Sequence, residues 1–382
     1  MTSANPAPKS PKARKTSPAK PTRTPFGQTV LVLQGGGALG AYQVGVYEAM
    51  HDAGIEPDWI IGTSIGAING AIIAGNPPQH RLARLNQFWD LIEHPVPDFG
   101  PLAWPGLGAM LANLGTVAQG IPGFFKPNPA ALMGNCAKLD VDQAAYYSTE
   151  PLRDTLNELV DFGYLGKCQT RLTVGAVHVQ GGEMRYFDSR DESLGIEHVM
   201  ASGALPPAFP AVRINGEPYW DGGLYSNTPI EAVLDDHPRK SSTIFAVNVW
   251  QLHGPEPQSI LDVMGRQKDI QYASRTDSHI ERQKQIHRLR HVIRELEQHI
   301  AAEKRDDPRI KALTAWGCGT TMHVLRLLAP RIEGEDMTKD IDFSTTGMAA
   351  RRQAGYADTM AMIERAPWEG AAESIEGVMV HS

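Results

Sequence analysis

The feature that most constrains the fold is an order repeated near the N-terminus: a short apolar strand, a glycine-rich turn and a helix. The run at 28–34 is apolar and β-branched, three glycines follow at 35–37, and helical spacing continues through 38–53. The run at 58–62 has the character of a second strand, and 65–74 that of a small-residue helix. Strands joined by crossover helices run parallel, so we expect an α/β fold around a mainly parallel sheet.

Segments further along the chain extend this alternation. Apolar residues recur at helical spacing over 79–93, which predicts an amphipathic helix. The alternating run at 171–179, the glycine turn at 180–183 and the return at 184–187 predict a β-hairpin. The run at 243–249 predicts a late strand.

The final third of the chain, from about residue 251, has mostly helical character. A long helix is predicted at 269–304, apolar on one face and highly charged elsewhere. Its mixed charge is typical of a packed surface helix or a dimer element rather than a membrane-binding helix. We therefore expect an α/β domain at 27–250 and a helical extension at 251–382 packed on it.

The first 26 residues differ from the rest in charge, because they hold six basic residues, six prolines and no acid. Residues 1–26 are therefore expected to form a disordered basic arm. The arm lacks the apolar run of a secretory signal and is either a solubilising leader or an electrostatic tether to anionic lipid. Without the arm, the net charge of −7 becomes −13 for residues 27–382. This acidic body argues against a nucleic-acid partner.

Length and cysteine content exclude further classes. A chain of 382 residues can bury a core that needs no disulfide or metal. It contains no apolar run of about 18 residues, so no membrane-spanning helix is expected. Three scattered cysteines, Cys136, Cys168 and Cys318, form neither a disulfide framework nor a metal-binding pattern, which fits a reducing, cytoplasmic location.

The first glycine turn, Gly35–Gly40, satisfies the GxGxxG pattern of dinucleotide-binding sites. Such a site also needs an acidic residue at the end of the second strand, to bind the ribose. Glu56 and Asp58 precede that strand instead. The pattern alone is therefore a weak indication of a dinucleotide site.

The second turn, Gly62-Thr63-Ser64-Ile65-Gly66, is a GxSxG motif at a strand-to-helix junction. In this context the motif is typical of a nucleophile elbow, in which Gly62 and Gly66 allow a tight turn that exposes the serine hydroxyl. The start of the following helix favours negative charge near that hydroxyl. The alternative is an ordinary strand–helix turn made of small residues.

The two glycine turns have a joint explanation in acyl transfer, which needs a nucleophile and a set of donors for the oxyanion. Consecutive glycines leave backbone N–H groups unshielded at a helix start, so Gly36, Gly37 and Ala38 are candidate donors. Both turns follow neighbouring parallel strands, at the carboxyl edge of the sheet where α/β proteins bind ligands.

The candidate base is Asp221, which follows a short strand and precedes Gly222 and Gly223. Taken alone, Asp-Gly-Gly is an ordinary turn. A Ser-His-Asp triad would instead use a histidine after Asp221. We expect each of these histidines to be a satisfied surface residue; they are His237, His253, His279, His287, His291, His299 and His323.

Four segments together resemble the patatin-like phospholipase family, in that family's order and spacing. They are Gly35-Gly-Gly-Ala-Leu-Gly40, the run from Gly54 to Ala71 that contains Gly-Thr-Ser-Ile-Gly, Ala201-Ser-Gly-Ala-Leu-Pro-Pro-Ala-Phe-Pro210 and Asp221-Gly-Gly223. The resemblance covers about residues 28–250. The stretch at 339–358 resembles a C-terminal extension found in one bacterial branch of the family.

The resemblance implies a three-layer α/β/α fold and a Ser–Asp dyad, with Ser64 as nucleophile and Asp221 as base. It also implies that Gly35, Gly36, Gly37 and Ala38 form the oxyanion hole, and that neither a metal nor a cofactor is needed. Members usually hydrolyse esters of phospholipids or neutral lipids. Many carry Arg or Lys where this chain has Leu39, but backbone donors would survive that difference.

The expected partner is therefore a lipid or another ester, with peripheral membrane contact and a homodimer as further expectations. The uncharged segment at 99–125 is the candidate acyl-binding or lipid-facing element, and core packing is its alternative. Three other functions stay open: hydrolysis of an intracellular ester or polyester, catalytically silent lipid binding, and dinucleotide-dependent oxidoreduction.

Overall fold

The computed structural model describes residues 25–94, 115–167, 169–273, 275–332, 335–370 and 375–382. Within these ranges a nine-stranded sheet has the order β11-β10-β9-β1-β2-β5-β8-β7, and β6 pairs with β5 outside this path. The strands are β1 (Gln28–Leu33), β2 (Trp59–Gly62), β5 (Arg171–His178), β6 (Met184–Asp188), β7 (Val212–Ile214), β8 (Glu217–Asp221), β9 (Ser242–Asn248), β10 (Met322–Leu328) and β11 (Val378–His381). Two short strands, β3 (Lys126–Pro127) and β4 (Tyr147–Ser148), form a separate pair.

Parallel pairing dominates the centre of the sheet, as the strand–helix alternation predicts. β1 lies between β2 and β9 and is parallel to both, and parallel pairing continues to β5 on one side and through β10 to β11 on the other. β6, β7 and β8 are antiparallel additions beyond β5. The predicted hairpin is the β5–β6 pair, and the predicted late strand is β9.

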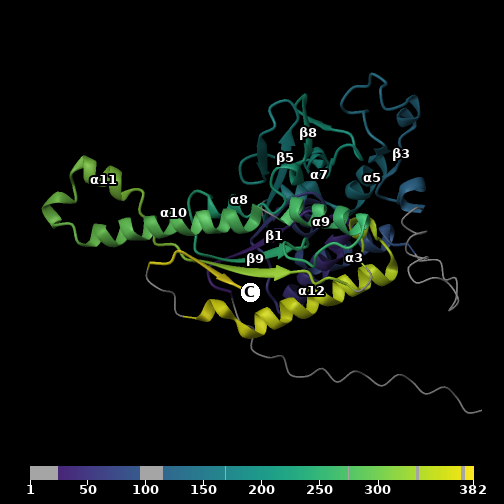
Figure 1. Ribbon diagram of the computed structural model, residues 1–382. Coiled ribbons are helices and arrows are strands. Elements are labelled where there is room, and N and C mark those ends of the chain that lie inside the picture. The colour runs from purple at the N-terminus through teal and green to yellow at the C-terminus, as the bar shows by residue number, and fades with distance from the viewer. Residues whose placement is uncertain (1–24, 95–114, 168, 274, 333–334, 371–374) are drawn as a thin grey trace, which may run out of the picture.

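Helices cover both faces of the sheet, which gives the expected three layers (Figure 1). Alternate residues of β1 enter two separate hydrophobic clusters, Leu31 and Leu33 in one and Val30 and Val32 in the other. The larger cluster includes α1 (Ala41–Asp52), α2 (Ile65–Ala74), α3 (Pro78–Ile92), α5 (Glu150–Leu159) and α12 (Thr345–Arg365). The smaller one includes α8 (Glu231–Leu234) and Ile280 of α10 (Arg275–Gln298).

The remaining helices are short or lie near the site and the C-terminal region. They are α6 (Phe162–Leu165), α7 (Ile196–Ser202), α9 (Ile260–Ala273), α11 (Pro308–Thr314) and the 3-10 turns η1 (Gly37–Gly40), η2 (Pro129–Met133), η3 (Gly222–Leu224), η4 (Ala302–Lys304), η5 (Lys339–Ile341) and η6 (Pro367–Glu369). Figure 1 shows α10 extending beyond the sheet, with α11 at its far end.

The C-terminal region is mostly helical, as expected, but it also contributes two strands that the sequence analysis did not identify. β10 pairs with β9 over seven residues, from Met322 against Ser242 to Leu328 against Asn248, and β11 pairs with β10. The sheet therefore continues across the boundary expected near residue 250. The predicted long helix is α9 and α10, with α10 ending at Gln298.

Two expected segments fall partly outside the described residues. Residues 1–24 of the basic arm and residues 99–114 of the uncharged segment lie outside the described residues. In the described end of the uncharged segment, Ile121, Phe124 and Phe125 are buried. The homodimer stays a prediction, although α10 exposes Leu289 and Leu296.

Two glycines allow α12 to pack against α1 with their backbones in contact. A Cβ at Gly45 of α1 would overlap the carbonyl oxygen of Arg352, and a Cβ at Gly355 of α12 would overlap that of Tyr42. The atoms that these Cβ groups would meet belong to the backbone, so no flexible side chain can move aside to make room. These two glycines fix how closely the C-terminal region packs on the N-terminal half of the chain, residues 25–250.

We expect Gly355→Ala to lower the free energy of unfolding by about 1–3 kcal/mol, because the added methyl group overpacks the α1–α12 contact. Because the added Cβ would overlap a backbone oxygen, we place the overpacking cost near the upper end of this range, where it exceeds the gain of about 1 kcal/mol that Ala brings to a helix. Urea unfolding measures the difference. Gly166→Ala is the control, because its Cβ would find ordinary contacts at 3.6 Å. Equal stability of Gly355→Ala and wild type would contradict the packing argument.

Candidate active site

Ser64 occupies a strained turn between β2 and α2. Its backbone has φ 56° and ψ −125°, which is unusual for a residue with a side chain. A Cβ at Gly62 would overlap the carbonyl oxygen of Gly66, and one at Gly66 would overlap that of Leu33. The Ser64 N–H donates to the carbonyl and to the hydroxyl of Ser202 on α7, both at 3.1 Å. The turn thus has the geometry expected of a nucleophile elbow.

The sheet register brings Asp221 to the same place. β5 lies between β2 and β8, with Gly62 paired to Val174 and Asp221 paired to Ala176. The chain leaves β2 at Gly62 and reaches Ser64 two residues later, next to the end of β8. Two residues far apart in the sequence are therefore neighbours at one edge of the sheet.

The Asp221 carboxyl group is buried and faces Ser64. Burial raises its pKa from the ordinary 3.8 to about 7, while hydrogen bonding with the Ser64 side chain and the Gly223 amide acts in the opposite direction. The Gly223 N–H donates to Asp221 Oδ1 at 2.7 Å, and the Asp221 N–H donates to the Ala204 carbonyl at 2.9 Å. A carboxyl group with this pKa can accept a proton near neutral pH.

The glycine-rich loop is held through its carbonyl groups, which leaves amides free to act as donors. The Gln34 carbonyl accepts from Gln43 Nε2 at 2.6 Å, and the Gly35 carbonyl accepts from Trp250 Nε1 at 2.8 Å and Asn227 Nδ2 at 3.0 Å. Within the described chain, the N–H groups of Gly36, Gly37 and Ala38 have no protein acceptor. These are the first donors of η1, which a helix start leaves unpaired.

Gly35 differs from the other three residues of the predicted oxyanion hole. Its N–H donates to the carbonyl of Asn227 at 3.1 Å, so this amide is engaged. A Cβ at Gly35 would lie 3.0 Å from Ser64 Cβ, and closer still to the Asn227 side chain. The structure therefore gives Gly35 a steric reason to be glycine, and Gly36, Gly37 and Ala38 remain the candidate donors.

A cavity of about 240 Å³ opens from these groups. Its polar end holds the glycine loop, Ser64, Asp221, Gly223 and Asn227. The rest of its lining is largely apolar and comes from both halves of the chain: Ile65, Ile68, Thr116, Val117, Phe124, Phe125, Tyr147, Gly203, Leu205, Ala208, Phe209, Trp250, Tyr272, Asp340, Ile341 and Phe343. One polar corner at the end of an apolar cavity suits an ester carrying a hydrocarbon chain.

No histidine lines this cavity among the described residues. Two of the seven candidate histidines named from the sequence are buried, contrary to the expectation of surface positions. His287 Nε2 donates to the Leu234 carbonyl at 3.1 Å, and His323 of β10 pairs with His381 of β11 at 3.1 Å. α10 packs against the sheet and β10 is part of it, so the mixed charge along α10 did not make every histidine on that helix exposed.

Several residues that shape the site were not identified as functional from the sequence. Ser202 holds the elbow amide, Asn227 and Trp250 hold the glycine loop, and Tyr272 and Phe343 line the cavity. The segment at 201–210 was part of the family resemblance, and the structure now places it beside Ser64. For Tyr272 and Phe343 the sequence carries no local signal of a place in the cavity wall.

No group of three or more His, Cys, Asp or Glu side chains within the described residues is placed to hold a metal ion. Every helix in the described ranges is too short or too polar to cross a bilayer.

Comparison with protein families decides the identity. The model of the patatin-like phospholipases matches residues 31–234, more than half of the chain. The chain belongs to the patatin-like phospholipase family. A second model, described as a patatin phospholipase, matches residues 270–374.

Similar curated proteins carry the name lysophospholipase NTE1. The protein of Eremothecium gossypii is 26% identical over 245 residues, which is 62% of this chain and 13% of that protein. The protein of Candida glabrata is 28% identical over 240 residues, 62% of this chain and 11% of that protein. This patatin-like chain thus matches only a small part of these relatives.

Among solved structures, VipD from Legionella pneumophila aligns with 88% of this chain and 67% of its own, at 15% identity and a TM-score of 0.38.

We expect Asp221→Asn to be more stable than wild type at neutral pH. Folded Asp221 keeps its proton up to about pH 7, whereas the unfolded chain releases it near 3.8. The folded state then binds more protons than the unfolded state, so wild-type stability falls relative to the variant as pH rises from 4 to 7. The difference reaches on the order of 4 kcal/mol and is constant above pH 7. Urea unfolding at several pH values measures it, and a pH-independent difference would contradict the raised pKa.

Proposed function

We propose that this patatin-like chain is a serine lipid acyl hydrolase, in which Ser64 is the nucleophile and Asp221 is the base. The observation that carries the proposal is the buried Asp221 carboxyl group facing the Ser64 side chain at the polar end of an apolar cavity. The raised pKa suits a group that takes a proton and returns it.

The reaction follows from these positions. Asp221 takes the proton of the Ser64 hydroxyl as Ser64 Oγ attacks the ester carbonyl. The negative charge that forms on the carbonyl oxygen is stabilised by the N–H groups of Gly36, Gly37 and Ala38. The C–O bond to the alcohol breaks, and the alcohol leaves with the proton held by Asp221. Water then gives a proton to Asp221 and attacks the acyl-Ser64 ester, and the carboxylic acid leaves as Ser64 regains its hydrogen.

The substrate class follows from the cavity and the relatives. An apolar wall of Phe124, Phe125, Phe209 and Phe343 surrounds the space beyond Ser64 and suits an acyl chain. The relatives' name, lysophospholipase, points to a glycerophospholipid ester. We therefore propose phospholipid or lysophospholipid esters as substrates, ahead of neutral lipids and polyesters.

Ser64→Ala is expected to abolish hydrolysis in a lipid panel, and Asp221→Asn to lower kcat by about 10²–10⁴-fold, because the nucleophile loses its base. A fluorophosphonate probe should label wild type and not Ser64→Ala. Circular dichroism of both variants controls for folding. Equal hydrolysis by all three proteins would mean that the site is misassigned, whereas probe labelling without lipid hydrolysis would favour a different ester or a silent lipid-binding protein.

The pH profile gives a second test of the base. Asp221 must be ionised to accept the proton, and its pKa is about 7. We therefore expect kcat/KM to rise about tenfold per pH unit below pH 7 and to level off above it. A profile that levels off below pH 5 would contradict the assignment of Asp221 as the base.

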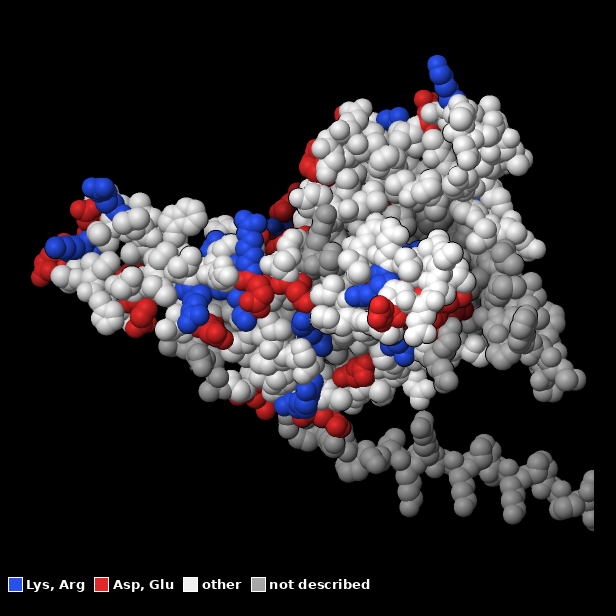
Figure 2. All heavy atoms as spheres, viewed as in Figure 1, with Lys and Arg blue, Asp and Glu red and all other residues white. Residues whose placement is uncertain are grey.

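We also propose that a surface beside the cavity mouth contacts lipid. Val117 lines the cavity and is half exposed, and its carbonyl accepts from Tyr147 of β4 at 2.6 Å. The hairpin of β3, η2 and β4 continues from these residues and exposes Leu132, Met133 and Tyr146. In Figure 2 the lobe that contains β3 shows mostly uncharged side chains. Apolar groups next to the entrance would help a lipid ester pass from a lipid phase to Ser64.

The double variant Leu132→Asp, Met133→Asp is expected to hydrolyse vesicle lipid about tenfold less, relative to a soluble short-chain ester, because two apolar contacts with the lipid are replaced by charges. The double variant Leu313→Asp, Trp316→Asp is the matched control, since it also adds two charges, at residues that are 64% and 66% exposed. An equal effect of both changes, or an unchanged ratio, would overturn the proposed lipid contact.

A further inference from the structure

A short part of the C-terminal region lies directly on the glycine loop. Asp340 and Ile341 of η5, and Phe343 beyond it, line the cavity with Ser64. Gly37 has φ +55°, and a Cβ there would overlap the backbone carbonyl oxygen of Asp340. The two backbones are therefore in contact at one of the amides assigned to the oxyanion.

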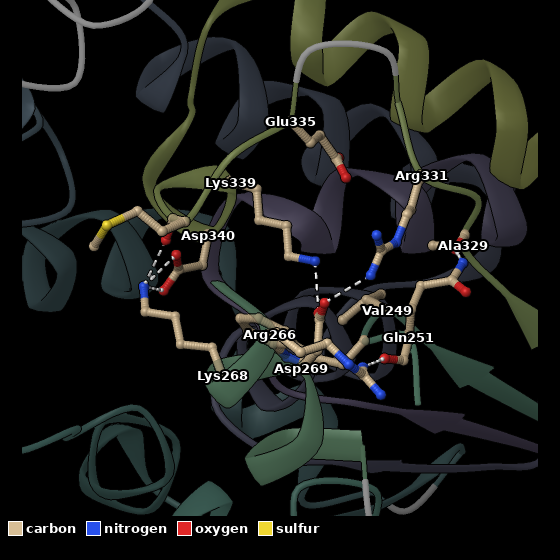
Figure 3. A network of polar contacts seen from close by, with 12 residues as sticks. Val249, Gln251, Arg266, Lys268, Asp269, Ala329, Arg331, Glu335, Lys339 and Asp340 are labelled. Carbon is tan, nitrogen blue, oxygen red and sulfur yellow. Dashed lines mark hydrogen bonds and ion pairs between the residues drawn. The ribbon is translucent and has the colours of Figure 1, made fainter. Parts of the chain in front are cut away.

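Two ion pairs join this segment to α9 in a crossed arrangement (Figure 3). Lys268 of α9 reaches both carboxylate oxygens of Asp340, at 2.7 and 2.9 Å, and the carbonyl of Met337 at 3.0 Å. The next residue, Asp269, accepts from Lys339 at 2.6 Å. Each segment thus has a lysine followed by an aspartate, Lys268-Asp269 on α9 and Lys339-Asp340 on η5. We call the two ion pairs, Lys268–Asp340 and Lys339–Asp269, the clasp. A shift of one residue along either segment would oppose like charges.

The inner pair of the clasp is buried. The side chains of Lys339 and Asp269 are only 7% and 4% exposed. The second oxygen of Asp269 accepts from Arg331 at 3.0 Å, and the Lys339 ammonium lies 5.3 Å from the centre of the Trp250 ring. Because a buried charge without its partner is strongly disfavoured, this pair fixes the position of η5 relative to α9.

Helix α9 also helps to hold the glycine loop. Its Tyr272 contacts the loop directly and packs against Trp250, which contacts the loop as well. The Trp250 ring packs against Tyr272 of α9, with ring centres 5.0 Å apart, while its Nε1 donates to the Gly35 carbonyl. The Tyr272 carbonyl accepts from Gln34 Nε2 at 3.2 Å. The loop is thus in contact with both α9 and η5, and the clasp connects those two elements.

We infer that the clasp positions the oxyanion donors, which makes Lys268, Asp269, Lys339 and Asp340 positioning residues for the hydrolysis at Ser64. This inference rests on the proposed function. It gives the C-terminal region a part in the chemistry: η5 supports the Gly37 amide from outside the catalytic half. Loosening the clasp lets the loop donors move away from the developing oxyanion, which lowers kcat more than it raises KM.

The test compares two ion pairs that both join the C-terminal region to the rest of the chain. Lys268→Gln breaks the outer pair of the clasp, whose side chains are 32% and 22% exposed. Arg352→Gln breaks the Arg352–Glu48 pair between α12 and α1, which has a similar length of 2.8 Å and exposures of 35% and 28%. The control pair does not line the cavity. A general loss of contact with the C-terminal region would therefore affect both variants alike.

Lys268→Gln is expected to lower kcat by about 10- to 100-fold, because the oxyanion donors move out of position, and to change KM much less. It should also speed deuterium exchange in a peptide spanning residues 34–40. Arg352→Gln should leave kcat and the exchange rate at residues 34–40 near the wild-type values. Lys268→Arg, which keeps the charge, should restore kcat and the exchange rate. Melting temperatures of the two Gln variants should agree within a few degrees.

The two readouts separate this inference from the proposed function. If kcat and exchange at residues 34–40 were equal in Lys268→Gln and Arg352→Gln, the inference that the clasp positions the donors would be overturned, even with a fully active wild type. A wild type inactive on every ester would overturn the proposed function, and the exchange comparison would still decide whether the clasp holds the loop. Asp269→Asn is a second variant, and unchanged exchange at 34–40 in it would also count against the inference.

Discussion

The site depends on one constraint, a carboxyl group held out of water beside a hydroxyl group. Asp221 is buried, and the groups that favour its ionised form among the described residues are the Ser64 side chain and the Gly223 amide. A fold that keeps an acid in such a place gives up stability at neutral pH. The register of β2, β5 and β8 and the close contact of Gly222 with the Gly175 carbonyl hold this group where it is.

Much of the catalytic half could be predicted because its signals are local. The apolar runs that became β1 and β2 are each followed by a glycine turn, and those turns are the glycine loop and the elbow. The glycines at Gly62 and Gly66 have the steric role that the motif implies, since a side chain at either would meet backbone. The pairing of Ser64 with Asp221, in contrast, could be predicted only from the family resemblance. An Asp-Gly-Gly sequence is an ordinary turn and does not indicate which residue the aspartate will contact.

The parts that could not be predicted are those made by contacts distant in sequence. Nothing near Gly37 announces that Asp340 will lie on it, and nothing near Tyr272 or Phe343 marks a cavity wall. Gly35 shows the same limit: the family resemblance implies that it belongs to the oxyanion hole, but its N–H donates to the carbonyl of Asn227. His287 was expected at the surface because its helix is charged, yet it lies against the Leu234 carbonyl. Tertiary packing decided each of these cases.

The extension of the sheet through β10 and β11 has a consequence for how this chain can be divided. β9 is a central strand only because β10 covers its outer side with a full set of backbone hydrogen bonds. A shortened chain that stopped near residue 250 would turn β9 into a bare sheet edge, uncover the apolar face of α1 beneath α12 and remove one wall of the cavity. The two stretches matched by separate family models thus share one sheet, one hydrophobic cluster and one cavity.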